Sequence, residues 1–227
     1  MIKNYLLTAF RNVLRYKGFS LINILGLSLS MSVCMVILVV IQDQYSYDEM
    51  HTKTDRIYRV QQVDSMANIS LNMASNPYAL GMELRDNYAI AEQVVILNNS
   101  FRGEGLYYDT RLDINGLYTN TEFFDVFDFQ LQDGSVEKIL DEPYTMVLSQ
   151  ETANKFFGDK NPMGKFIEID TLGAYEVKGI VAKTKKKSHI QFEALISLST
   201  LEILDQKREV PRFVNNWETG WGSWIYL

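Results

Sequence analysis

A glycine-rich loop is the first segment whose residue types could do chemistry. Residues 158–165 read GDKNPMGK, and a similar loop cradles phosphates in many nucleotide-binding proteins. Here the two glycines stand one residue too far apart. Phe166 takes the place of the magnesium-binding Ser or Thr, and Pro162 removes one backbone N–H from the cradle. We therefore predict a turn between a helix and a strand, without nucleotide binding.

A calcium-binding loop is the second candidate. Asp113, Asn115, Gly116 and Glu122 occupy positions 3, 5, 6 and 12 of the calcium-loop template. Position 1 is Arg111, which is a cation where the metal requires a carboxylate. Because the flanking residues also read as strand, we predict a strand and a turn.

The two histidines are the third candidate. His51 and His189 are 138 positions apart, and no cysteine lies near either. This spacing indicates neither a metal site nor a Ser–His nucleophile pair, so a structural or surface role is favoured for each. The sequence predicts no catalytic, cofactor-binding or metal-binding residue, and we expect a protein that is not an enzyme.

Three residue clusters each leave two interpretations open. One is a basic cluster in an acidic region, formed by Lys183, Lys185, Lys186 and Lys187. Such a run is typical of a solvated hairpin tip, and contact with lipid headgroups or an acidic partner is the alternative. Aromatic residues crowd into residues 123–129 and 217–224, where core packing is favoured over a docking face.

An uncharged apolar run is the element that must position the rest. Phe19 to Ile41 spans 23 residues without a charged side chain, which makes about 34 Å of helix against a bilayer core of about 30 Å. We predict a membrane helix over residues 18–42. Gly26 and Ser30 are four residues apart, a spacing that permits close helix packing or is simply tolerated in lipid. A cleaved signal peptide is disfavoured, because eleven membrane-compatible residues follow Ser30.

Charges of opposite sign flank this run. The residues ahead of it carry only basic charges, on Lys3, Arg11, Arg15 and Lys17. The residues just after it carry only acidic charges, on Asp43, Asp48 and Glu49. Because Lys and Arg concentrate on the cytoplasmic side, we predict a protein of the bacterial inner (plasma) membrane with a cytoplasmic N-terminus. Residues 43–227 are then a periplasmic domain.

An amphipathic helix is predicted ahead of the span, over residues 1–17. Its apolar residues recur at helical spacing: Ile2, Tyr5, Leu6, Ala9, Phe10, Val13 and Leu14. Such a segment lies in the membrane interface with its basic groups among the lipid headgroups. Ordinary positive flanking of a membrane helix is the simpler alternative. Gly18 is expected to break the helix before the span.

The composition beyond the span limits the possible partners. Removing the four N-terminal cations leaves 18 basic and 28 acidic residues, a formal charge of −10. This balance argues against nucleic-acid binding, which requires a clustered positive field. The only cysteine, Cys34, lies in the span, so the outer domain has no disulfide and must be held together by its core.

Alternation and turn signals predict a mixed α+β fold with antiparallel strands. Strands are expected at residues 56–63, 93–97, 106–108, 112–118, 144–148, 165–169, 175–181 and 192–198. Helices are expected at 77–88 and 150–157, with short helical segments at 121–127 and from Thr200. Ser149 is the predicted N-cap of the helix at 150–157, and Gly158 its terminating residue.

Several short motifs carry a resemblance in their order and spacing. They are residues 2–6 with 11–12, 17–23 with 26–27, 47–48, 55–60, 123–129, 147–149, Ala153, 156–158, 161–165, and 188–189 shortly before Phe192. On these motifs the chain resembles, over nearly its whole length, the N-terminal part of a MacB-like or FtsX-like ABC transporter permease of the type common in Bacteroidetes.

The resemblance implies a permease subunit whose periplasmic core domain follows the first membrane helix. Its implied partners are membrane lipid, a second permease copy in a homodimer, and a cytoplasmic ABC ATPase that binds the ATP; a periplasmic partner is also compatible. It further implies that the segment joining the helix to the domain transmits motion. We name this the root segment, residues 47–59, and assign the coupling role to Tyr47, Asp48, Asp55, Arg56, Tyr58 and Arg59.

The sequence departs from the family pattern at its end. It stops at residues 224–227, within an expected strand, and has none of the later membrane helices. We therefore expect a fragment or a truncated product whose domain is incomplete at the C-terminus. The alternative function is a single-pass anchor whose ectodomain recruits or regulates an envelope partner such as a cell-wall hydrolase.

Overall fold

The computed structural model describes residues 2–66, 69–137, 139–184, 186–210, 214–217 and 222–227. The chain divides into two compact units, Met1–Tyr47 and Asp48–Leu227. Each unit is described by itself below.

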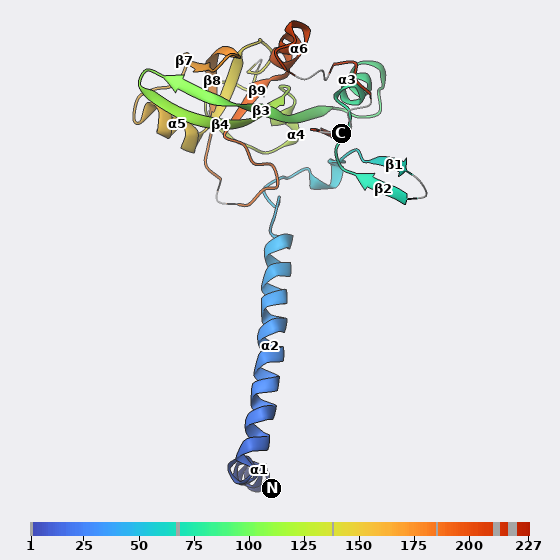
Figure 1. Ribbon diagram of the computed structural model, residues 1–227, viewed down its shortest axis with the longest axis vertical. Helices are drawn as coiled ribbons and strands as arrows, with labels where there is room; N and C mark the ends of the chain where they lie inside the picture. Colours follow the sequence, from blue (N-terminus) through green and yellow to red (C-terminus); the bar gives the residue numbers. More distant parts are fainter. Residues whose placement is uncertain (1, 67–68, 138, 185, 211–213, 218–221) are drawn as a thin grey trace. The chain divides into compact units, whose positions relative to one another are not determined.

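Two helices make up the first unit, α1 (Ile2–Arg15) and α2 (Lys17–Tyr45). Between them Tyr16 leaves the helical conformation, with φ −108° and ψ 58°. Figure 1 shows α1 turned sharply away from the axis of α2. The break therefore lies at Tyr16 and not at Gly18, because Ser20 already donates to the Tyr16 carbonyl at 2.9 Å and draws Gly18 into α2.

α2 is long and apolar enough to cross a membrane. The hydroxyls of Ser30 and Ser32 donate back to the carbonyls of Gly26 and Ser28, at 2.9 and 2.8 Å. The polar groups of these serines are thus satisfied within the helix, which lowers the cost of placing them in lipid.

A mixed sheet organises the second unit (Figure 1). Its strands run in the order β10 (Ser223–Tyr226), β3 (Val95–Tyr107), β4 (Thr110–Thr119), β9 (Ala194–Ser197), β6 (Thr145–Ser149), β8 (Gly173–Val181) and β5 (Leu131–Asp133). A further strand, β7 (Phe166–Ile169), pairs with both β3 and β8. Strands β1 (Gln62–Met66) and β2 (Ile69–Met73) form a separate two-stranded sheet.

Most strand pairs are antiparallel, as predicted. The pairs β4–β9 and β6–β8 are parallel. Through β7, the strands β3, β4, β9, β6, β8 and β7 form a closed circuit of pairings. The predicted α+β class is confirmed, with these two parallel pairs in addition.

The helices of the second unit are short. They are the 3-10 turn η1 (Thr54–Arg56), α3 (Tyr78–Asn87), α4 (Phe123–Val126), α5 (Gln150–Phe157) and α6 (Leu198–Lys207). The Ser149 hydroxyl accepts a hydrogen bond from the Thr152 N–H at 3.2 Å, as expected of an N-cap. Gly158 follows α5 with φ 59°. Both predicted boundary residues of α5 are confirmed.

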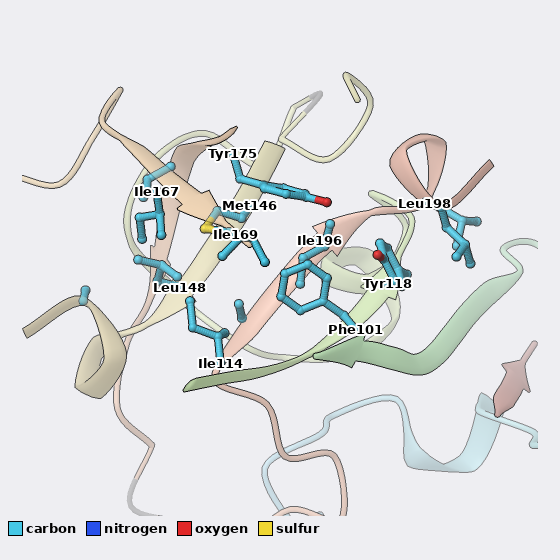
Figure 2. Packing of buried hydrophobic residues seen from close by; sticks show 14 of the residues in the cluster. Phe101, Ile114, Tyr118, Met146, Leu148, Ile167, Ile169, Tyr175, Ile196 and Leu198 are labelled. Atoms are coloured by element: carbon cyan, nitrogen blue, oxygen red, sulfur yellow. The ribbon is translucent and has the colours of Figure 1, made fainter. Parts of the chain in front are cut away.

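Successive residues along the strands serve two hydrophobic clusters. Ile96 belongs to one cluster, and its neighbours Val95 and Leu97 belong to the other. The first cluster includes residues of α3, α5 and α6, and Figure 2 shows Phe101, Ile114, Met146, Ile167, Tyr175 and Ile196 among its side chains. The second includes Phe123 and Val126 of α4. Side chains alternate across a sheet, so each cluster covers one side of it.

The prediction of one continuous strand over residues 56–63 is wrong. Residues 54–56 form η1, and regular pairing begins only at Gln62 in β1. The alternation was misleading, because Tyr58 and Val63 are exposed, at 66% and 63%. Only a short extended stretch at residues 57–60 joins the sheet, beside β10.

Other boundaries also differ from the prediction. The strands predicted at 93–97 and 106–108 are one strand, β3, whose register with β4 shifts between Asn98 and Phe101. Strands β2 and β5 were not predicted. The last helix begins at Leu198, two residues before Thr200, and its first residue is buried in the core.

Candidate functional site: the root segment

The root segment consists of the last residue of the first unit and residues 48–59 of the second. Tyr47 is the last residue of the first unit, and its N–H donates to the Gln44 carbonyl at 3.3 Å. Asp48 has φ 59°, a left-handed conformation that asparagine and aspartate tolerate better than most residues. Its N–H donates to the carbonyl of Lys187 at 2.9 Å. The first residue of the unit is thereby fixed to a loop 139 positions away.

The Asp48 carboxylate binds the same loop. Its Oδ1 accepts hydrogen bonds from the Ser188 hydroxyl at 2.6 Å and from the His189 N–H at 3.0 Å. Its Oδ2 lies 2.6 Å from Nδ1 of His189. Burial opposes ionisation of Asp48, but the hydrogen bonds from Ser188 and His189 outweigh it and lower the pKa of the carboxyl. Asp48 is therefore a charged anchor.

His51 follows Asp48 by three residues and is buried. Its Nδ1 accepts a hydrogen bond from the Asp128 N–H at 3.1 Å, and its ring contacts Phe127 and Phe129 edge-on. Its Nε2 has no hydrogen-bond partner and lies 3.9 Å from Oδ1 of Asp48. Burial lowers the pKa of His51, although the Asp48 and Asp128 carboxylates act in the opposite direction. The imidazole is therefore neutral at pH 7 with its proton on Nε2.

The next two residues bind the loop that follows α4. The Thr52 N–H and hydroxyl both donate to Oδ2 of Asp128. Lys53 Nζ donates to the Asp125 carbonyl at 2.6 Å. The backbone hydrogen bond from Thr52 lowers the pKa of Asp128. Residues 48–53 are thus held by two loops that are remote in sequence.

Residues 56–60 attach the root segment to the sheet. Tyr58 and Leu227 exchange two backbone hydrogen bonds of 3.0 and 2.9 Å, and the Val60 N–H donates to Ile225 at 2.9 Å. Arg59 pairs with Tyr226 as an isolated bridge. Arg56 makes a 2.6 Å ion pair with Glu92, but both side chains are exposed, so this pair contributes little stability.

Apolar side chains strengthen this attachment. Met50 and Ile57 pack against the second hydrophobic cluster, beside Phe127 and Phe129. A groove runs next to them, lined by Lys53, Arg56, Tyr58, Ile90, Glu92 and neighbouring residues. Among the predicted coupling residues, Asp48, Arg56, Tyr58 and Arg59 contact residues of the unit that are distant in the sequence. The Asp55 side chain is exposed, although the Asp55 carbonyl accepts from the Tyr58 hydroxyl at 3.3 Å.

The aromatic residues 123–129 pack in the core. Phe123, Phe127 and Phe129 are 0, 3 and 8% exposed, and Phe124 is partly buried. The favoured interpretation is confirmed for this cluster. Of the aromatic residues at 217–224, Trp224 packs against the core and Trp217 is 55% exposed. Trp221 lies outside the described residues.

The other sequence motifs take structural places. Residues 158–165 form the predicted turn between α5 and β7, and Asp113 and Asn115 lie in β4. In the basic cluster, Lys186 Nζ donates to the Glu49 carbonyl at 3.1 Å, and Lys185 lies outside the described residues. Within the described ranges, no group of three His, Cys, Asp or Glu side chains has the geometry of a metal site.

The predicted span residues Phe19, Gly26, Ser30 and Ile41 all lie in α2.

The sequence marked Asp48 but not the residues that bind it. The hydrogen bonds of Asp48 to Ser188 and His189, and of His51 to Asp128, join positions 77 to 141 residues apart. Ser188 and His189 belonged to one of the short motifs of the resemblance, and that was the only signal that marked them.

The chain thus combines an apolar helix of membrane-spanning length with an α+β unit whose first residues are held by hydrogen bonds. A family model described as the MacB-like periplasmic core domain matches residues 20–221. The chain therefore belongs to this family, whose domains occur in ABC-type transporter permeases.

Three solved structures are similar to the chain, and the fold is supported by the first. A domain of a protein assigned as a permease, from Porphyromonas gingivalis, is 18% identical with a TM-score of 0.61, over 78% of this chain and 76% of that one. The periplasmic region of MacB from Actinobacillus actinomycetemcomitans is 14% identical with a TM-score of 0.48, over 80% and 76% of the two chains. The extracellular domain of the transporter YknZ from Gram-positive bacteria is 19% identical with a TM-score of 0.45, over 66% and 70%. No curated protein matches the sequence.

Proposed function

We propose that the chain is the N-terminal portion of a permease subunit in an ABC-type efflux or mechanotransmission system. A separate cytoplasmic ATPase binds ATP, and a second permease copy completes the transporter. The subunit lies in the bacterial inner membrane with its N-terminus in the cytoplasm. Its helix α2 passes motion to a periplasmic domain, and the subunit itself catalyses no reaction.

The root segment is the observation that supports coupling. A helix can move a domain only if the connection between them is stiff. Residues 48–53 are bound to residues 125–128 and 186–189, and residues 58–60 pair with β10 and Leu227. Ordering these residues costs conformational entropy, and the contacts offset that cost. A flexible tether would have no such contacts and would stay disordered. The assigned roles of Tyr47, Asp48, Asp55, Arg56, Tyr58 and Arg59 are part of this proposal.

Copurification from native cells tests the proposal. We expect the full-length gene product to bring down an ABC ATPase whose ATP hydrolysis is measurable in lipid. Recovery of a cell-wall hydrolase and no ATPase would instead support the single-pass anchor.

Insertion of a flexible linker between Tyr47 and Asp48 tests the coupling role. Six Gly and Ser residues should leave ATPase binding unchanged but abolish the nucleotide-dependent change in tryptophan fluorescence of the outer domain. The matched control places the same linker after Gly134, in an exposed loop far along the chain. A fluorescence change that survives the first insertion contradicts a stiff root.

A further inference from the structure

The buried imidazole of His51 lies between the root segment and residues 127–129, which we call the aromatic loop. On its own segment it faces the carboxylate of Asp48, which is also bound by His189 from the loop at 186–189. From the aromatic loop it faces Asp128, whose carboxylate is bound by Thr52 and lies near Lys53. Phe127 and Phe129 cover its ring and carry no charge.

The hydrogen bond from the Asp128 N–H requires a lone pair on Nδ1 of His51. A neutral imidazole with its proton on Nε2 supplies that lone pair. A proton taken from solvent would occupy the same lone pair, and two N–H groups would then face each other across 3.1 Å. Protonation therefore breaks this hydrogen bond and leaves a charge in an aromatic pocket.

We propose that the attachment of residues 48–53 to the aromatic loop is pH-sensitive. Protonation of His51 at Nδ1 releases the Asp128 amide and loosens this attachment. The predicted loss of stability does not depend on the transport role. A second consequence, weaker coupling between α2 and the periplasmic domain when the outer face is acidic, rests on the proposed function.

The sign follows from the direction of the pKa shift. The pKa of His51 is lower in the folded protein than in the unfolded chain, where it is about 6.5. The stabilising contribution of neutral His51 is therefore fully present above about pH 6.5 and is lost as the pH falls toward the folded value. Asp48 and Asp128 also have lowered pKa values, but their contributions are lost only at more acidic pH, below about 4.

Histidine NMR of the full chain in nanodiscs is a direct test, because the sequence has only two histidines. His189→Gln assigns the remaining imidazole signal to His51. We expect that signal to show the Nε2–H tautomer at pH 7.5 and to titrate below pH 6.5. An Nδ1–H tautomer, or a titration midpoint at or above 6.5, overturns the proposal.

Thermal unfolding supplies the second measurement. The wild-type midpoint should fall by about 2–4 °C between pH 7.5 and pH 5.5. His51→Asn places an amide oxygen near the position of Nδ1 and removes the titration of this side chain, so its midpoint should change less than that of the wild type over this range. Equal shifts in both proteins would refute the proposal. Should His51→Asn not fold, the wild-type NMR titration still decides. Neither result depends on the recovery of an ATPase, so the failure of one proposal leaves the other intact.

Discussion

At the scale of single residues, Asp48 binds the loop at residues 187–189 through both its side chain and its backbone. One carboxylate accepts hydrogen bonds from Ser188 and His189, and its backbone N–H binds Lys187. Charged acceptors make stronger hydrogen bonds than neutral ones. The sequence indicated that Asp48 follows the span. Its hydrogen bonds to Ser188 and His189 depend on the tertiary structure. No local pattern encodes them.

Replacement of Asp48 should therefore destabilise the domain. We expect Asp48→Ala to lower the free energy of unfolding by about 1–3 kcal/mol, because the Ser188 and His189 donors lose their acceptor. Asp48→Asn keeps an oxygen acceptor and tolerates the left-handed backbone, so it should cost less. The measurement is urea unfolding followed by fluorescence of the three tryptophans, all after residue 216.

A nearby acid supplies the matched control. The Asp55 side chain is exposed and belongs to the same root segment. Asp55→Ala should change the free energy of unfolding by less than about 0.5 kcal/mol. Equal losses for both substitutions would mean that Asp48 is not an anchor.

At the scale of elements, the sequence predicted best where the signals are local. Ser149 and Gly158 marked both ends of α5, and alternation marked β7 and β8, because caps and periodicity are written in neighbouring residues. It failed at residues 56–63, where the extended stretch exists only because β10 lies beside it. It also divided β3 into two strands, since the irregular register near Asn98 interrupts the alternation.

The N-cap of α5 gives a quantitative prediction. Ser149→Ala removes the acceptor for the Thr152 N–H and should cost about 1 kcal/mol of folding stability. Ser149→Thr retains the hydroxyl and should restore most of the loss. Urea midpoints of the two variants measure the difference, and equal midpoints would show that the cap hydrogen bond contributes nothing.

Close strand packing gives another prediction. A Cβ added at Gly116 in β4 would lie 2.5 Å from Cδ1 of Ile196 and 2.8 Å from the Ala194 carbonyl oxygen. Gly116→Ala should therefore cost about 1–3 kcal/mol through overpacking. Asp113→Ala, at an exposed position of the same strand, is the control and should be nearly neutral. Thermal midpoints of both variants compare the effects, and a neutral Gly116→Ala would show that β9 can move away.

At the scale of the whole molecule, the long apolar helix and the α+β class were predictable because both depend on composition and periodicity. Orientation was inferred from the charges on either side of that helix, and it remains a prediction. The long-range pairing order, with β7 closing a circuit between β3 and β8, was not predictable. It depends on contacts between strands that are distant in the chain.

Thiol labelling tests the orientation. In a Cys34→Ser background, a membrane-impermeant maleimide added to spheroplasts should label Ser135→Cys, which lies in an exposed loop of the second unit. It should label Thr8→Cys, in α1, only after the membrane is broken. The reverse pattern would place the N-terminus outside and would overturn the assignment from flanking charge.

The stretch at residues 57–60 has a consequence for the fate of a cleaved protein. β10 is a terminal strand of the sheet, and its outer edge is covered by hydrogen bonds to Tyr58 and Val60, with Asn76 beside them. Bare edges of sheets invite pairing with other chains. A protease that removed residues up to 60 would therefore release an aggregation-prone remnant rather than a well-behaved soluble domain. Residues 57–60 thus also shield the sheet from self-association.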